Sequence, residues 1–383
     1  MKLTILLIIT LLTFPQIAVC QDEYEKLIAN AAKAEQLNLP ERAEHYYRNA
    51  IEIAGDSKAE PHYKLALILE QKDRFYDAVT SLTQALSIAE TADIGTPYTG
   101  AIYEHLAYCQ IELKHYDDAY ENAQKAIEYN AGSASAMASI ALILNHRDEH
   151  TNAKGWAARA IEADPKYARG HNTMGVICYH RGNDSEAIKH FRNAIKADST
   201  NIDAYNNIGI MYCIRNNFES AILQLRKGIK QEPRSTRLYY TLGHAYRMKG
   251  DDERAIAAFH RVLEIDSLYI RAYVQLGDIS NSKGDYNQAV SYYKKATTIE
   301  PSNPEGYKGL GRTYTERGDY TKALSNYQKA IQADPKDNTI YMHIAELYAR
   351  QGNSQRETSS YKKAAKLGNK EAQSWLTKRG ITW

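Results

Sequence analysis

The chain has 383 residues, of which 44% are hydrophobic and 25% are charged, and its formal net charge at pH 7 is +2. This near balance of charge gives no support for binding to nucleic acid or to an acidic membrane surface through the chain as a whole. The length would allow two or three ordinary domains, so the organisation has to be inferred from patterns along the sequence.

The first 20 residues form a separate segment. Lys2 is followed by an apolar run over residues 3–14 and then by a short region that ends at Cys20. The run is too short to span a bilayer and has the layout of a secretory signal peptide, so we expect an exported protein, periplasmic or secreted, that begins at Gln21. The alternative is a lipoprotein signal, in which an acylated Cys20 anchors the chain to the outer membrane. Val19 fits that signal poorly, because a small residue normally precedes the acylated cysteine.

From residue 100 onward the sequence repeats with a step of 34 residues. Glycine, tyrosine and alanine each recur at this spacing: Gly175, Gly209, Gly243, Gly277 and Gly311; Tyr205, Tyr239, Tyr273, Tyr307 and Tyr341; Ala187, Ala221, Ala255, Ala289 and Ala323. A period near 34 is typical of stacked helical hairpins, in which each unit buries its apolar face against the next. One repeat array therefore replaces the separate domains that the length alone would allow.

Each unit is expected to contain two helices. In the unit 304–337, Leu310 and Tyr314 share one face of a first helix, and Ala323 and Tyr327 share one face of a second. The spacing of these apolar positions changes between the two groups, which places a turn between them. The unit is therefore predicted to be a helical hairpin.

Equivalent positions of successive units are called a column here. Glycine occupies two such columns, and the two have different expected roles. Gly277 and its equivalents lie in the first helix, where a missing side chain lets the second helix approach, so a bulky residue there should cost about 1–3 kcal/mol. The other column falls between the helices and is followed by Asp or Asn, at Gly250, Gly284, Gly318 and Gly352. Glycine at this place predicts a left-handed end to the first helix, and Asp or Asn predicts an N-cap for the second.

The unit 304–337 closely resembles the tetratricopeptide repeat. It reads Tyr307-x2-Leu310-Gly311-x2-Tyr314, then Ala323-x3-Tyr327, then Pro335. The resemblance implies an all-α, right-handed superhelical solenoid of about ten hairpins with a C-terminal cap over residues 369–383. The expected units are 24–57, 59–92, 100–133, 134–167, 168–201, 202–235, 236–269, 270–303, 304–337 and 338–371, and residues 93–99 are expected to lengthen one join.

Three cysteines follow the signal segment: Cys109, Cys178 and Cys213. Cys178 and Cys213 occupy adjacent columns of neighbouring first helices, so a disulfide is conceivable, but buried small residues in helix packing are favoured. His146 and His150 fall where a turn should lie, which favours a solvated turn over a metal site. His171 stands in the tyrosine column and is predicted to pack in its place. We expect no catalytic residue, no metal and no cofactor.

The resemblance also implies that the first helix of each unit lines the inner surface of the superhelix. The early units place acidic, aromatic and apolar residues there: Glu60, Glu70, Glu104, Tyr63, Tyr108, Leu67, Ile111 and Leu142. The later units place mainly basic, amide and aromatic residues there, Arg169, Asn172, Asn206, Arg237, Tyr240, His244, Arg247, Arg271, Lys308 and Arg312, with Asp203, Asp278 and Glu305 among them. Guanidinium groups suit carboxylates, and amides suit peptide backbones.

These positions predict a non-catalytic scaffold that binds a protein or peptide, with an acidic or C-terminal segment of the partner lying across residues 168–312. Envelope assembly, secretion and adhesion are the expected settings. A solvated face with charges of random sign would produce the same pattern. The alternative function is capture of a glycan or cell-wall fragment as an accessory to an enzyme encoded elsewhere, but arginine and asparagine outnumber aromatic residues at these positions. The oligomeric state stays open.

Overall fold

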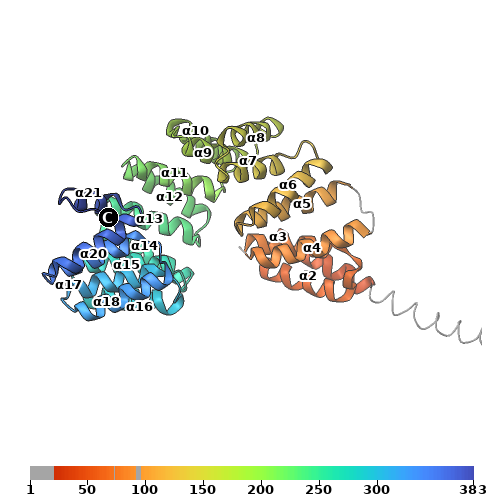
Figure 1. Ribbon diagram of the computed structural model, residues 1–383. Coiled ribbons are helices and arrows are strands. Elements are labelled where there is room, and N and C mark those ends of the chain that lie inside the picture. Colours follow the sequence, from red (N-terminus) through yellow and green to blue (C-terminus); the bar gives the residue numbers. More distant parts are fainter. Residues whose placement is uncertain (1–20, 73, 92–95) are drawn as a thin grey trace, which may run out of the picture. The chain divides into compact units, whose positions relative to one another are not determined.

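The computed structural model describes residues 21–72, 74–91 and 96–383, and the predicted signal peptide with Cys20 lies outside them. All regular secondary structure of the described residues is helical, and consecutive helices pair into hairpins (Figure 1). The predicted all-α solenoid is confirmed. None of the described helices is both long enough and apolar enough to cross a membrane.

The chain divides into two compact units within α11 (Ile202–Ile214), one of residues 1–204 and one of residues 205–383. The helices of the first unit are residues 21–36, α2 (Pro40–Ala54), α3 (Ala59–Gln71), α4 (Phe75–Thr91), α5 (Thr96–Glu112), α6 (Tyr116–Tyr129), α7 (Ala134–His146), α8 (His150–Ala163), α9 (Ala168–His180) and α10 (Asp184–Ala197), with a short 3-10 helix η1 (Gly55–Ser57). From α11 onward follow α12 (Phe218–Gln231), α13 (Thr236–Lys249), α14 (Asp252–Ile265), α15 (Ile270–Ser282), α16 (Tyr286–Ile299), α17 (Pro304–Glu316), α18 (Tyr320–Ala333), α19 (Asn338–Arg350), α20 (Ser354–Lys366) and α21 (Lys370–Thr377).

The join before the third hairpin differs from the prediction. Residues 96–99 do not lengthen a loop, because they form the first turn of α5, a helix of 17 residues. Proline is compatible with a first helical turn, where a backbone N–H has no partner within the helix. The sequence pattern could not show this, because these residues precede the repeat columns.

In the hairpins that have glycine in the first helix, this glycine makes the close contact with the second helix. A Cβ atom added to Gly277 would lie 2.6 Å from Cε1 of Tyr293, a fully buried residue of the second helix. Gly243 stands in the same relation to Phe259, also at 2.6 Å. The close approach predicted at Gly277 is therefore confirmed, and the ring that fills the space comes from the partner helix.

Each hairpin turn that the structure describes in full contains one residue with left-handed backbone. Gly250 has φ +86°, and Asp251 after it accepts a hydrogen bond from the backbone N–H of Arg254 at 3.1 Å, so both predicted roles are confirmed. Several hairpins hold the left-handed conformation without glycine, at Asn38, Lys114, Asp148 and Asn216. The stack of helices, rather than the glycine alone, therefore imposes this conformation.

Helix α21 covers the end of the last hairpin. Asn369 accepts a hydrogen bond from the backbone N–H of Ala372 at 2.8 Å and so caps the helix. The ring of Trp375 stacks on Tyr361 of α20 with centroids 4.1 Å apart, and Leu376 is fully buried. The predicted capping helix is confirmed.

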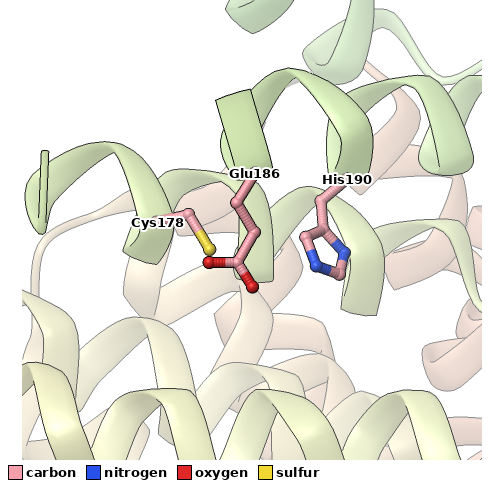
Figure 2. Close-up of side chains that lie close together, drawn as sticks. All are labelled: Cys178, Glu186 and His190. Carbon is pink, nitrogen blue, oxygen red and sulfur yellow. The ribbon is translucent and has the colours of Figure 1, made fainter. Parts of the chain in front are cut away.

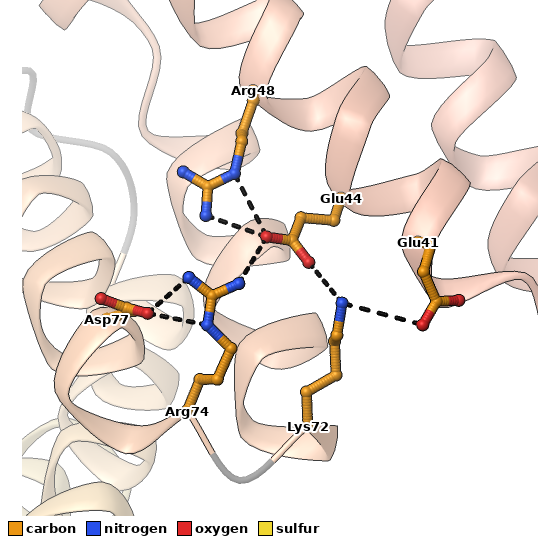
Figure 3. Close-up of polar contacts among 6 residues, drawn as sticks. All are labelled: Glu41, Glu44, Arg48, Lys72, Arg74 and Asp77. Atoms are coloured by element: carbon orange, nitrogen blue, oxygen red, sulfur yellow. Dashed lines mark hydrogen bonds and ion pairs between the residues drawn. The ribbon is translucent and has the colours of Figure 1, made fainter.

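In the first unit, a buried carboxylate ties α2 to the turn after α3 (Figure 3). Glu44 of α2 lies 2.9 Å from Arg48, 2.7 Å from Lys72 and 2.8 Å from Arg74. Burial raises the pKa of Glu44, but the hydrogen bonds and charges of the three cations outweigh burial and lower the pKa to about 2. The charged form of Glu44 therefore stabilises the packing of the first hairpins.

Candidate peptide-binding surface

Asp278 of α15 is the centre of a charge network in the second unit. The Tyr293 hydroxyl of α16 donates to Oδ1 of Asp278 at 2.7 Å, and Arg312 of α17 donates to the same oxygen. Arg247 of α13 lies 3.6 Å from Oδ2 and donates to Gln275. Arg247 and Arg312 therefore neutralise a carboxylate of their own chain, and they offer a partner less positive charge than the sequence suggests.

Lys308 and Asn206 are also engaged between neighbouring hairpins. The Lys308 ammonium lies 2.6 Å from Glu305 and 2.9 Å from Asp337. Burial lowers the pKa of Lys308, but these two carboxylates outweigh burial and the pKa is raised. Asn206 is buried, and its side-chain oxygen accepts a hydrogen bond from Thr241 at 2.7 Å. Both side chains support the packing of the hairpins.

Four residues of the same face form what we call the arginine–tyrosine cluster: Arg237, Tyr240, Tyr269 and Arg271. Both arginines are exposed, as predicted. The rings of Tyr240 and Tyr269 lie 5.4 Å apart, tilted by 52°. Burial raises the pKa of Tyr269, and the positive charges of Arg271 and Arg237 act against this rise. Two guanidinium groups therefore stand close to one aromatic pair.

Tyr269 was missed by sequence reasoning. It is the N-cap residue of α15, at the end of one 34-residue unit, and lies outside the positions assigned to the inner surface. The sequence feature that could have revealed Tyr269 is its position two residues before Arg271, at the start of the first helix of the unit 270–303. The first turn of α15 thus supplies both an aromatic ring and a cation to the cluster.

His244 packs against Tyr240 of the cluster and adds no charge to it. Its ring lies 4.8 Å from Tyr240 and 5.8 Å from Phe259, edge-on to both. Burial lowers the pKa of His244, and the positive charge of Arg247 lowers it further. The imidazole is therefore neutral at pH 7 and holds the Tyr240 ring in place.

In the first unit, Arg169 and Asn172 belong to α9. The Arg169 guanidinium lies 4.1 Å from the ring centroid of Tyr108 on α5, a cation–π arrangement. Nearby on the same face, His105 hydrogen-bonds to Glu70 at 2.9 Å. Tyr108 and Glu70, two of the residues predicted for the early units, therefore make contacts within the chain.

The three cysteines and His171 lie outside this surface. Cys109, Cys178 and Cys213 are free and buried, as the packing interpretation predicts. His171 lies 3.2 Å from the carbonyl oxygen six residues before it, and Tyr273 in the same column makes the equivalent contact at 3.2 Å. His171 therefore replaces a tyrosine, as predicted.

His146 and His150 lie on different helices. His146 ends α7, and its ring centroid is 3.8 Å from that of Tyr116. His150 begins α8, and its Nδ1 atom lies 2.9 Å from the side-chain oxygen of the buried Asn145. The turn between them separates the two imidazoles into different packing contacts.

Comparison with known proteins agrees with the hairpin architecture. Family models described as tetratricopeptide repeat match residues 59–91, 110–168, 236–269 and 270–303, and a model described as TPR repeat matches residues 175–212 and 311–352. A search of curated proteins gave no match.

Several solved structures are similar over part or most of the chain. The crystal structure of MamA is 27% identical, covers 43% of this chain and 97% of its own, and gives a TM-score of 0.39. Pseudomonas aeruginosa pilF is 20% identical over 57% of this chain and 97% of its own, with a TM-score of 0.48. A human IFIT1 dimer with m7Gppp-AAAA is 15% identical over 88% of both chains, with a TM-score of 0.55, and shows a shared fold. The repeat columns, the paired helices and the matching family models together show that this chain belongs to the tetratricopeptide repeat family.

Proposed function

We propose that this protein is a non-catalytic scaffold that binds an extended segment of a partner protein through the arginine–tyrosine cluster. Repeat solenoids offer extended surfaces of this kind, made from equivalent positions of successive units. The observation that carries the proposal is the arrangement of the cluster itself. Arg237 and Arg271 are exposed and lie close to Tyr269, whose ring centroid is 5.4 Å from that of Tyr240.

The chemistry of the cluster favours a carboxylate-bearing segment. A guanidinium group presents a planar fork that bonds a carboxylate through two parallel hydrogen bonds. The tyrosine rings near the arginines add apolar contact area with little loss of side-chain freedom. An acidic side chain or a free C-terminal carboxylate therefore suits the arginines, and an apolar neighbour in the segment suits Tyr240 and Tyr269.

The double variant Arg237→Ala/Arg271→Ala is expected to bind such a segment about 10–100-fold more weakly, because two sets of charge-assisted hydrogen bonds are lost. The partner is first captured from envelope fractions with the wild-type chain, and a synthetic peptide of its bound segment is then titrated by fluorescence anisotropy. Wild-type affinity should also fall as salt rises, since exposed charges are screened beyond about 8 Å at physiological ionic strength.

The control is Arg226→Ala/Arg261→Ala, which removes two exposed guanidinium groups from α12 and α14. This variant should keep wild-type affinity and salt dependence. Circular dichroism should show that both double variants remain folded. A peptide that binds the Arg237→Ala/Arg271→Ala variant with unchanged affinity and salt dependence would place the interface elsewhere.

We also propose that the protein is exported and acts in envelope assembly, secretion or adhesion. The support is the sequence of residues 1–20, with Lys2 before an apolar run and a short region up to Cys20. Intact-mass measurement of the protein purified from its native host should give a chain that starts at Gln21 and carries no lipid. A mass that includes Cys20 with acyl chains would instead establish a lipid anchor.

A further inference from the structure

A cluster of three potential metal ligands lies inside the α9–α10 hairpin. Cys178 belongs to α9, and Glu186 and His190 belong to α10; the three side chains gather in one place (Figure 2). One ligand atom from each residue lies within 4.8 Å of the other two. Glu186 and His190 are four residues apart and so share one face of α10, opposite Cys178. Among the described residues, no other histidine, cysteine or carboxylate group of three gathers this closely.

The ligand types select the metal. Thiolate, imidazole and carboxylate are the three groups that bind Zn²⁺ in proteins, at bond lengths of about 2.0–2.3 Å. Donors bound tetrahedrally at these lengths lie about 3.3–3.8 Å from one another, so the three side chains need only small rotations to close on an ion. We propose that Cys178, Glu186 and His190 form a zinc site with one coordination position left for water or an external ligand.

The contacts around the cluster include long hydrogen bonds from Lys154 and a ring nitrogen of His190 that has no partner within the described residues. Lys154 of α8 reaches Glu186 at 3.3 and 3.4 Å, the long end of the hydrogen-bond range. Its ammonium is therefore a weakly held cation beside the carboxylate that would bind zinc. The Nδ1 atom of His190 is buried and has no hydrogen-bond partner within the described part of the chain, so packing does not use the full bonding capacity of this ring.

Zinc binding at this cluster is linked to the release of a proton. Burial lowers the pKa of His190, and the neighbouring His171 lowers it further. Burial and Glu186 raise the pKa of the Cys178 thiol to about 11, so zinc has to displace a proton from sulfur. A metal ion beside the sulfur supplies the charge that stabilises the thiolate.

A related trio in the first unit provides the internal comparison. Glu70 accepts hydrogen bonds from His105 at 2.9 Å and from Cys109 at 3.3 Å, with the histidine and cysteine four residues apart on α5. The three residue types are the same, but the ligand atoms of this trio do not all come within 4.8 Å of one another. Cys109→Ser is therefore the matched control for Cys178→Ser.

The test titrates the full-length protein with Co²⁺, whose bond to a thiolate gives a charge-transfer band, and then with Zn²⁺ in competition. The wild type should bind one equivalent with the band present. Cys178→Ser should abolish the band, and Glu186→Gln or His190→Gln should weaken binding at least about tenfold. Lys154→Met should strengthen binding, because it removes the competing ammonium from Glu186.

Cys109→Ser should leave the band and the affinity unchanged. Circular dichroism checks the fold of every variant, and Lys154→Met keeps the proposal testable even where a ligand variant unfolds, because it predicts a gain. The proposal is overturned if the wild type gives no thiolate band, if Cys178→Ser keeps it, or if Lys154→Met leaves the affinity unchanged.

Discussion

Replacing Gly309 with valine is expected to lower the free energy of unfolding of the second unit by about 3 kcal/mol. A Cβ atom at Gly309 would collide with the Tyr293 ring, and the same ring also lies against Gly277, where an added Cβ would be 2.6 Å away. Tyr293 is fully buried, and its hydroxyl is fixed by Asp278, so the ring has nowhere to move. Urea denaturation followed by circular dichroism measures the loss.

Hydrogen exchange should locate the loss in α15, α16 and α17, because each hairpin packs mainly against its neighbours. The control is Gly155→Ala in α8, where an added Cβ meets nothing within 4 Å. Alanine is favoured over glycine inside a helix by about 1 kcal/mol, so this variant should be slightly more stable than the wild type. A Gly309→Val protein with wild-type stability would show that Tyr293 is not confined by the two glycines.

Glu44→Gln is expected to lower the free energy of unfolding at pH 7 by about 1–3 kcal/mol. The pKa of Glu44 falls from 4.5 to about 2 on folding, and a shift of this size corresponds to at most about 3 kcal/mol. Arg48 and Arg74 are 49% and 41% exposed, so solvent screens part of their effect and the expected value lies below this limit. Urea denaturation at a series of pH values measures the difference between the variant and the wild type.

The sign of the pH dependence follows from the lowered pKa. The charge of Glu44 contributes its full stabilisation above the unfolded-state pKa, and the contribution is lost as pH falls toward 2. The difference between Glu44→Gln and the wild type should therefore be largest at pH 7 and disappear near pH 2. Glu41→Gln is the control, because Glu41 is 77% exposed, lies 3.8 Å from Lys72 and should change stability by less than about 0.5 kcal/mol. A Glu44→Gln difference that stays constant from pH 7 to pH 2 would refute this account.

The fold could be predicted because the same helix–helix contacts recur every 34 residues, and they require the same kinds of residue each time. At Gly277, as at Gly243 and Gly311, a small residue faces a ring, and at Ala289, as at Ala255 and Ala323, a small residue is fully buried. Gly309 could not be predicted in this way, since it lies outside the glycine columns and responds to Tyr293 alone. The 34-residue repeat therefore predicts the contacts that the units share, but it does not predict a contact that is made in one unit only.

The candidate site was predicted only in part, for a physical reason. Positions on one face of successive first helices were treated as free charges, but neighbouring hairpins bring them into contact. Asp278 and Arg312 are 34 residues apart, in the same column of adjacent units, and they form an ion pair. Opposite charges in one column of adjacent units are therefore a sign of pairing that the sequence already contains.

Helix α21 limits how long this array can become. The outer face of the last hairpin is the template on which another hairpin of the same design would stack, whether from an engineered extension or from a second copy of the chain. Trp375 and Leu376 occupy that template through their contacts with the α20 side of the hairpin. A designer who wishes to lengthen the solenoid should therefore delete α21 and join the new repeat directly after residue 366. With α21 in place, the chain carries its own terminator against end-to-end polymerisation at this face.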